Sequence, residues 1–394
     1  MRFIHVADLH FDRTFEGLTK ELPADFSKKL NQANEKTLKN IVTTAIEQNV
    51  DFVIFAGDTF HQMNPSLKNQ QLLMQQFEKL AQAEIPVYLI FGNHDYYEEN
   101  RYWFAFPDNV VLFETETVKT ITATTKNGEK YALSGFSYRQ QYLTKKMAQE
   151  FPLRNLEVDY HIGIYHGDVQ DANFAPFSVS ELKSKNYDYW ALGHIHQPTQ
   201  LSAEMIYPGT PQGHTKKELD LGNVLLLELT GSNINVSKRS VAALRWQKRT
   251  ISLASCENNA TVLNYLSKQL APVSAKTALL LELVLTDSEH LQNFAEMITN
   301  GQLQDLLNQQ WPAQIFVHTL KLQETKHKIS LPASDLLKTQ LLQEFSHDEI
   351  FKEVLTELTI NKNTTLLLED PEFRQEVLKQ VAAELNEQFE WGQD

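Results

Sequence analysis

Phe91-Gly92-Asn93-His94-Asp95 is the stretch of sequence around which the rest of the chain can be arranged. It ends an apolar run from Ile85 that predicts a buried strand of a parallel sheet. Polar groups placed here lie at the carboxyl end of the strand, where open α/β sheets carry their sites. Asn93 offers a neutral oxygen ligand, His94 a proton donor, and Asp95 a carboxylate that could orient the histidine. Taken alone, the stretch could also be a capped turn, so its meaning depends on how other strands end.

Four further apolar runs, each predicted to be a strand, also end in Asp or His residues. Their exits are Asp8-Leu9-His10, Gly57-Asp58-Thr59-Phe60-His61, His166-Gly167-Asp168 and Gly193-His194-Ile195-His196. The usual winding of α/β chains brings such exits to one edge. Oxygen and imidazole donors without thiolate favour a two-metal hydrolytic centre over a structural zinc site. Two metals about 3.5–4 Å apart can clamp a phosphate for in-line displacement.

Three residues near these exits have both a functional and a structural interpretation. His61 could reach a substrate phosphate or cap its turn. Arg101 lies in an aromatic stretch, residues 96–104, on which bases could stack or which could pack on the domain. Thr210 lies in the turn Tyr207-Pro208-Gly209-Thr210-Pro211, whose backbone donors could face a phosphate or serve the turn alone.

Length and composition restrict the class of protein. A chain of 394 residues should hold two or three domains. Its formal charge of −14 argues against non-specific adhesion to DNA or anionic membranes, although bound metal ions can dominate a local field. The single cysteine, Cys256, excludes an intramolecular disulfide and a thiolate zinc site. With no signal peptide and no membrane-spanning apolar run, a cytoplasmic location is expected.

The periodicity of apolar residues predicts the remaining elements. Helices are expected at 25–49, 67–83, 138–156 (interrupted at Pro152), 260–270 and 288–307, and strands at 110–113, 118–125, 130–135, 224–229, 234–239, 278–285 and 313–322. Residues 334–394 are predicted to be mostly helical and hold fourteen Asp and Glu against five Lys and Arg, which is −9 of the total −14. A helix at 371–391 carries an apolar stripe that either packs within the protein or docks a partner, with Phe351, Val354 and Leu358 completing the surface.

The order Asp-x-His, Gly-Asp, Gly-Asn-His-Asp, His and Gly-His-x-His resembles the calcineurin-like metallophosphoesterases over residues 1–245. Within that superfamily, residues 1–10, 57–61 and 207–210 resemble SbcD-type DNA repair exonucleases, and the length and acidic tail are closest to the YhaO-like bacterial branch. The resemblance implies an α/β fold: a metallophosphoesterase β-sandwich flanked by helices at 1–249, a small α+β capping domain at 250–333 and an acidic helical partner-binding region at 334–394.

The same resemblance implies roles for individual residues. One metal would be held by Asp8, His10 and His196, and the second by Asn93, His166 and His194, with Asp58 bridging both. His94 would protonate the departing sugar oxygen, Asp95 would orient His94, and His61 would position the scissile phosphate. Manganese is expected from relatives, while iron, zinc and magnesium also fit these donors.

The expected function is a metal-dependent DNA exonuclease or endonuclease that acts in DNA repair. Its expected partners are DNA, a coiled-coil ATPase of the SbcC type docked on the C-terminal helices, and optionally a second copy of the chain, with no membrane contact. Two alternatives stay open: a phosphodiesterase or phosphatase of small nucleotides on the same centre, and a scaffold with a vestigial metal site.

Overall fold

The computed structural model describes residues 1–18, 22–271, 277–311, 314–323, 329–345 and 371–392. Contacts divide the chain into two compact units, Met1–Leu285 with His290–Leu322, and Thr286–Glu289 with Gln323–Asp394. The first unit therefore holds both the segment predicted to be the metallophosphoesterase and most of the predicted cap.

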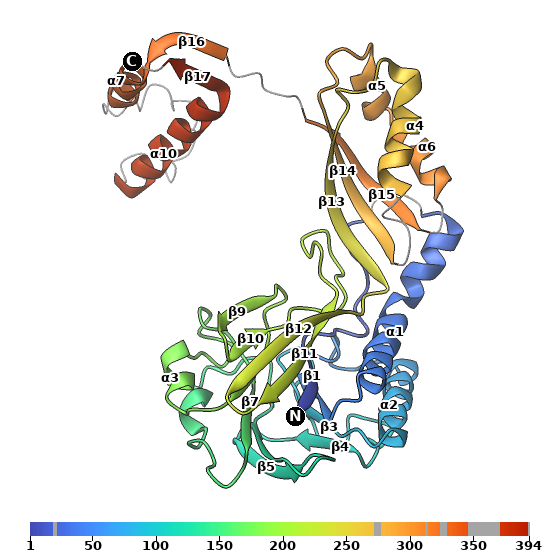
Figure 1. Ribbon diagram of the computed structural model, residues 1–394, viewed down its shortest axis with the longest axis vertical. Helices are drawn as coiled ribbons and strands as arrows, with labels where there is room; N and C mark the ends of the chain where they lie inside the picture. Colours follow the sequence, from blue (N-terminus) through green and yellow to red (C-terminus); the bar gives the residue numbers. More distant parts are fainter. Residues whose placement is uncertain (19–21, 272–276, 312–313, 324–328, 346–370, 393–394) are drawn as a thin grey trace. The chain divides into compact units, whose positions relative to one another are not determined.

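Two six-stranded sheets form most of the first unit (Figure 1). The first has the order β12-β11-β1-β2-β3-β4, in which β1 to β4 are parallel and β11 and β12 are antiparallel neighbours. Its strands are β1 (Arg2–Val6), β2 (Phe52–Ala56), β3 (Val87–Ile90), β4 (Val110–Phe113), β11 (Asn223–Thr230) and β12 (Asn233–Ser240). The parallel register places the carboxyl ends of β1, β2 and β3 at one edge.

The second sheet has the order β5-β6-β7-β8-β10-β9, with β6, β7, β8 and β10 parallel. Its strands are β5 (Lys119–Thr124), β6 (Lys130–Gly135), β7 (Tyr160–His166), β8 (Tyr189–Gly193), β9 (Thr199–Ser202) and β10 (Met205–Tyr207). Antiparallel β5 and β6 are joined around Asn127-Gly128, as the sequence predicted.

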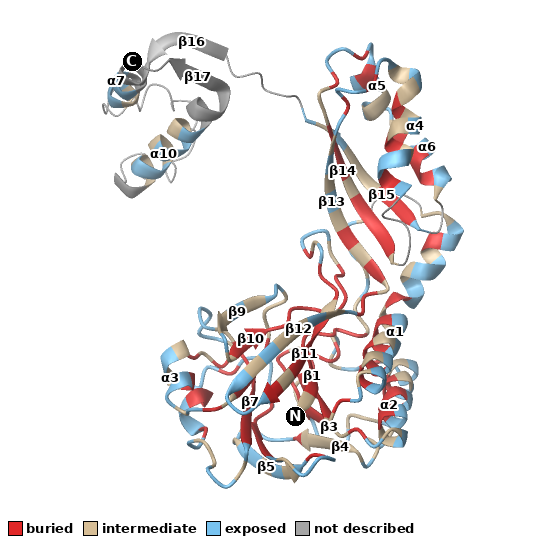
Figure 2. Cartoon of the chain, in the orientation of Figure 1, coloured by how far each residue is buried: buried red, intermediate tan, exposed pale blue. Residues whose placement is uncertain are grey.

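A core of large side chains fills the space between the two sheets. Phe52 of the first sheet stacks on Tyr131 of the second with ring centroids 4.8 Å apart. On the outer face of the first sheet lie α1 (Ala24–Glu47) and α2 (Leu67–Gln82), which bury Leu38, Ile41 and Val42 among others. Because both faces of the central strands are covered, these strands are apolar without alternation, and Figure 2 shows them buried.

A smaller α+β part follows in the same unit. Its elements are β13 (Leu244–Ser252), α4 (Asn259–Leu270), β14 (Ala278–Thr286), α5 (Phe294–Thr299), α6 (Gln302–Gln310) and β15 (Ile315–Leu322). The sheet has the order β13-β14-β15, and Leu280 and Phe316 share a buried cluster with Phe26 of α1. The expected domain boundary at 249 falls inside β13.

Two predicted helices are wrong. Residues 138–156 contain only the short 3₁₀ helix η1 (Met147–Glu150), and this segment buries Tyr138 and Phe151 against the outer face of the second sheet, as α3 (Val179–Lys183) does with Leu182. The predicted helix 288–307 is two helices, α5 and α6, because Gly301 adopts φ +78° between them.

The described part of the second unit contains a parallel pair of strands and two helices: β16 (Ile329–Ser334), α7 (Asp335–Phe345), α10 (Pro371–Gln388) and β17 (Phe389–Gly392). The helix predicted to reach residue 391 therefore ends at Gln388, and Phe389 begins a strand. Phe351, Val354 and Leu358 lie outside the described residues. In the part of the chain that is described, no helix has the length and apolar character to cross a membrane.

Candidate metal centre

Five strand exits converge where the two sheets meet, after β1, β2, β3, β7 and β8. They bring together all the residues expected to bind metal: Asp8, His10, Asp58, Asn93, His166, His194 and His196. The potential ligand atoms of Asp8, His10 and His196 lie within 4.8 Å of one another, and so do those of Asp8, Asp58 and His166.

Glycines let these exits approach one another closely. A Cβ on Gly57 would lie 2.3 Å from His166 Nδ1, and one on Gly92 would lie 2.2 Å from Asp58 Oδ1. Asp8, His10, Asp58 and His194 have positive φ angles of 51°, 44°, 50° and 108°. Non-glycine residues rarely adopt such angles, and strained backbone of this kind clusters at functional sites.

The first group of donors consists of Asp8, His10 and His196. His10 Nε2 and His196 Nε2 lie 3.0 Å apart. Two nitrogens bound to one ion at 2.0–2.1 Å and at right angles are also about 3.0 Å apart. Glu218 Oε1 lies 2.7 Å from His196 Nδ1, so Nδ1–H donates to the carboxylate and the Nε2 lone pair faces His10. A carboxylate behind a histidine is a common support for metal ligands.

The second group consists of Asn93, His166 and His194. His166 Nδ1–H donates to the Ala56 carbonyl at 3.0 Å, which leaves its Nε2 lone pair facing Asn93 Oδ1, also at 3.0 Å. His194 Nδ1 lies 3.0 Å from the same oxygen. Lone pairs of His166 and Asn93 pointing at each other repel unless a cation sits between them, so the arrangement fits a bound metal ion.

Asp58 lies between the two groups. Its Oδ2 is 3.7 Å from His10 Nε2 and 3.6 Å from His166 Nε2. Its Oδ1 accepts the backbone N–H of His94 at 3.0 Å, which fixes the carboxylate against the loop after β3. One carboxylate thus faces donors from both groups.

Burial controls the charge of these donors. It lowers the pKa of His10 well below its usual range and that of His194 to about 4, and it raises the pKa of Asp8 to about 6. For His196, burial also acts to lower the pKa, but the Glu218 hydrogen bond and nearby carboxylates outweigh it, and the net shift is upward. At neutral pH His10 and His194 are therefore uncharged, the state that ligation requires.

The two expected catalytic histidines face the same centre. The His94 ring stacks on His61 with centroids 4.6 Å apart and meets His10 edge-on at 5.0 Å. His94 and His61 are half-buried, so a substrate can reach them. The N–H of His61 donates to Asp12, which gives His61 a fixed backbone position.

Asp95 does not orient His94 as expected. Its carboxylate accepts three backbone N–H groups, from Gly92 at 2.8 Å, Thr59 at 2.8 Å and Phe60 at 3.1 Å. Asp95 is 1% exposed, and these bonds tie the exit of β2 to the exit of β3. Its role in the structure is to hold two ligand-bearing loops together.

Arg101 and Thr210 were expected to contact substrate, and both are engaged within the protein instead. Arg101 donates to the carbonyl groups of Asp95 and Tyr96 and pairs with Glu98 at 2.8 Å. Thr210 is 1% exposed; its hydroxyl donates to the Asp8 carbonyl at 2.7 Å, and its N–H donates to the His196 carbonyl. Arg101 therefore supports the loop after β3, and Thr210 supports the loop after β1.

Two residues that sequence reasoning left without a role also support the site. Glu218 holds His196, and no motif marks it, since it is twenty-two positions away. Asp168 has Oδ2 3.7 Å from His194 Nε2. Its place in His166-Gly167-Asp168 made it visible as a strand-exit carboxylate.

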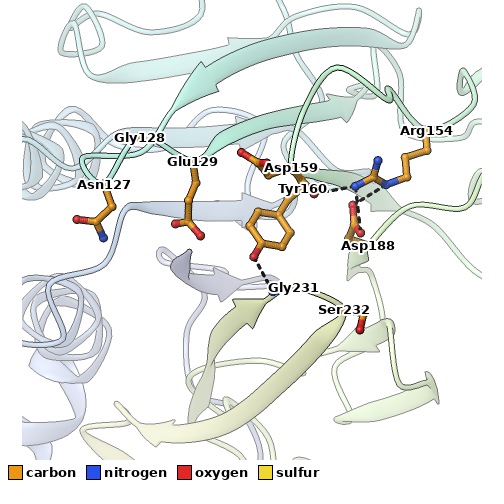
Figure 3. Close-up of a pocket in the computed structure, with 9 residues that line it drawn as sticks. All are labelled: Asn127, Gly128, Glu129, Arg154, Asp159, Tyr160, Asp188, Gly231 and Ser232. Carbon is orange, nitrogen blue, oxygen red and sulfur yellow. Dashed lines mark hydrogen bonds and ion pairs between the residues drawn. The ribbon is translucent and has the colours of Figure 1, made fainter.

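Another pocket lies at the opposite, amino ends of the strands of the second sheet, with a volume of about 510 Å³ (Figure 3). Its charged groups are engaged within the protein: Arg154 Nε lies 3.0 Å from Asp188 Oδ2, and Glu129 pairs with the amino group of Met1 at 2.9 Å. Tyr160 Oη accepts the Gly231 N–H at 3.0 Å. These bonds hold the amino ends of the second sheet's strands together and join them to the turn between β11 and β12 of the first sheet. A structural role therefore accounts for this pocket.

Comparison with known proteins gives the family. A family model of calcineurin-like phosphoesterases matches residues 1–198. The chain belongs to the calcineurin-like phosphoesterase family. YhaO of Bacillus subtilis (strain 168), described as an uncharacterized metallophosphoesterase, is 30% identical to this phosphoesterase over 362 residues, which are 89% of this chain and 88% of YhaO.

More distant similarities are shorter. The DNA double-strand break repair proteins Mre11 of Methanocaldococcus jannaschii and Archaeoglobus fulgidus are 25% and 24% identical to this phosphoesterase, over 50% and 55% of its chain and 52% of each relative. A dimetal phosphatase from Danio rerio superposes with a TM-score of 0.37 and 9% identity over 61% of this chain and 96% of that one. Family membership identifies the protein as a phosphoester hydrolase, and its His and Asp groups fit a divalent metal.

Proposed function

We propose that this phosphoesterase is a two-metal phosphodiesterase that cleaves DNA strands. The observation that carries the proposal is Asp58, whose Oδ2 lies 3.7 Å from an imidazole of one donor group and 3.6 Å from an imidazole of the other. A shared carboxylate of this kind suits two ions held close together. The similarity to proteins named for DNA double-strand break repair supports DNA as the substrate.

The residues divide between two ions as follows. Asp8, His10 and His196 would hold one, Asn93, His166 and His194 the other, and Asp58 both. Divalent ions held there would polarise a phosphoryl group and activate water. We propose manganese as the physiological metal, because these oxygen and imidazole donors accept it.

His94 is proposed as the general acid for the departing sugar oxygen. Its ring meets His10 of the first donor group edge-on, with centroids 5.0 Å apart, and its backbone N–H is anchored on Asp58 at 3.0 Å. His61, stacked on it, would contact the phosphate being cleaved. Burial lowers the pKa of His61, so this imidazole is neutral at neutral pH and donates a hydrogen bond without adding a charge.

We further propose that the second unit binds a coiled-coil ATPase of the SbcC type. Phe373, Val377 and Val381 of α10 are half-buried at helical spacing. An amphipathic helix with such a stripe suits docking against partner helices. Deletion of residues 335–394 should abolish co-purification with that ATPase and preserve metal content; retained binding would contradict the docking role.

The test of the function is a comparison of substrates on the manganese-loaded protein. We expect cleavage of end-labelled duplex or single-stranded DNA together with turnover of bis-p-nitrophenyl phosphate, a small diester. Efficient hydrolysis of cyclic or linear dinucleotides with intact DNA would instead identify an enzyme of small nucleotides. A protein that binds metal but hydrolyses none of these substrates would contradict catalysis altogether.

A further inference from the structure

A pocket of about 470 Å³ adjoins the metal centre on the side of His196. Two segments form its walls. They are residues 13–17, which follow the Asp8-Leu9-His10 exit, and residues 215–218, which follow the turn that contains Thr210. Three of its lining residues are cations, Arg13, Lys216 and Lys217. On a chain with a formal charge of −14, such a cluster beside a metal ligand calls for an explanation.

The two lysines of this pocket are available to a ligand. Lys216 and Lys217 are exposed, and neither ammonium forms an ion pair with any residue that the structure describes. Arg13 forms ion pairs with Glu16 and Glu218, each at 3.5 Å. Its Nε is buried and lacks a hydrogen-bond partner among the described groups.

The acidic groups of the pocket pair with Arg13 but do not cancel the charge of the two lysines. Glu218 is occupied by His196 at 2.7 Å and by the N–H groups of His214 and Thr215 at 2.6 and 3.0 Å. Glu16 is exposed at the rim, where its charge is screened by water. The Glu16 N–H donates to the His214 carbonyl at 2.9 Å, so the two walls are tied to each other before any ligand binds.

We infer that this pocket binds a backbone phosphate of the substrate strand next to the phosphate that is cleaved, through Arg13, Lys216 and Lys217. Lysine and arginine contacts of this kind hold a polynucleotide in register without reading its sequence. The inference rests on the proposed function and deepens it, because the pocket would make the enzyme favour a polymer over a small diester that has no second phosphate.

The test uses the double variant Lys216→Gln/Lys217→Gln on the full chain. Loss of contacts to this one phosphate of single-stranded DNA should lower the slope of log KM against log salt by about 0.7 and raise KM about tenfold near 0.15 M salt. Turnover of bis-p-nitrophenyl phosphate and metal content should change less than twofold. The variant Lys216→Arg/Lys217→Arg should restore KM.

The matched control is Lys119→Gln/Lys130→Gln, which removes the same charge from exposed lysines of β5 and β6. An equal rise in KM in this control would reduce the effect to net charge and overturn the inference. If DNA cleavage by the wild type is intact but KM and the salt slope are unchanged in the Lys216/Lys217 variant, the pocket does not bind a phosphate of the substrate strand. The proposed function would then still stand. A wild type that turns over the small diester but no DNA would overturn the proposed function and the pocket with it.

Discussion

Replacement of Glu218 by alanine should weaken metal binding although Glu218 is not itself a proposed ligand. The carboxylate fixes the His196 ring through a 2.7 Å bond to Nδ1, and it holds the loop beneath through the N–H groups of His214 and Thr215. Burial opposes its charge, yet these three donors lower the pKa of Glu218 to about 2. The residue is therefore ionised at neutral pH.

The size of the effect follows from these contacts. Removing the partner that orients a histidine ligand typically costs about 10–100-fold in metal affinity. That range corresponds to about 1.4–2.7 kcal/mol. Glu218→Gln keeps the side-chain volume and one oxygen acceptor but loses the charge, so its affinity should lie between those of the wild type and Glu218→Ala.

The assay is calorimetric titration of the metal-free protein with manganese, followed by hydrolysis of bis-p-nitrophenyl phosphate at saturating metal. Glu157→Ala, which removes an exposed carboxylate, is the control and should bind metal as the wild type does. At saturating manganese, much of the lost activity should return, because the ligands themselves are intact. Unchanged affinity in a folded Glu218→Ala protein would refute the view that this carboxylate supports His196.

Asp58, His94 and His5 each give a further prediction. Asp58→Asn should abolish hydrolysis with the fold intact, measured by turnover and circular dichroism; activity within a few-fold of wild type would contradict a shared carboxylate. His94→Ala should keep its metal by elemental analysis but lose about 10²–10⁴-fold in rate, and loss of metal would instead make His94 a ligand. Burial lowers the pKa of His5 to about 3, so its contribution to stability is complete above about pH 6.5 and is lost as pH falls toward 3. The His5 ring also contacts the Tyr189 hydroxyl at 3.0 Å and the Leu192 carbonyl at 3.1 Å. In metal-free protein, His5→Gln should therefore have a lower Tm at pH 7.5 but a smaller fall in Tm on acidification. An equal fall in Tm in both proteins would show that protonation of His5 is not a source of acid destabilisation.

The strand exits could be predicted from the sequence because their chemistry is local. Consecutive residues encode an apolar strand followed by glycine and a polar ligand. Parallel pairing of β1, β2 and β3 then brings the exits together. The glycines are needed because His166 and Asp58 fill the space that a Cβ at Gly57 or Gly92 would take.

The features that escaped prediction depend on contacts between distant residues. Glu218 reaches His196 only through the fold of the loop that joins them. Asp95 looked like the partner of His94 because the two are adjacent, but its oxygens point to the backbone of Thr59 and Phe60, thirty-six and thirty-five positions away. Residues 138–156 have helical spacing, yet burial of Tyr138 and Phe151 against the second sheet determines their path.

The most direct test of a two-metal centre is to measure the number of manganese ions bound per chain and DNA cleavage in the same samples. We predict that wild-type protein binds two ions and that cleavage appears only as the second is bound. Asp58→Asn should then bind fewer ions and leave DNA intact. Full cleavage with a single ion per chain, or two ions bound tightly by an Asp58→Asn protein that still cleaves DNA, would contradict a two-metal centre built around Asp58.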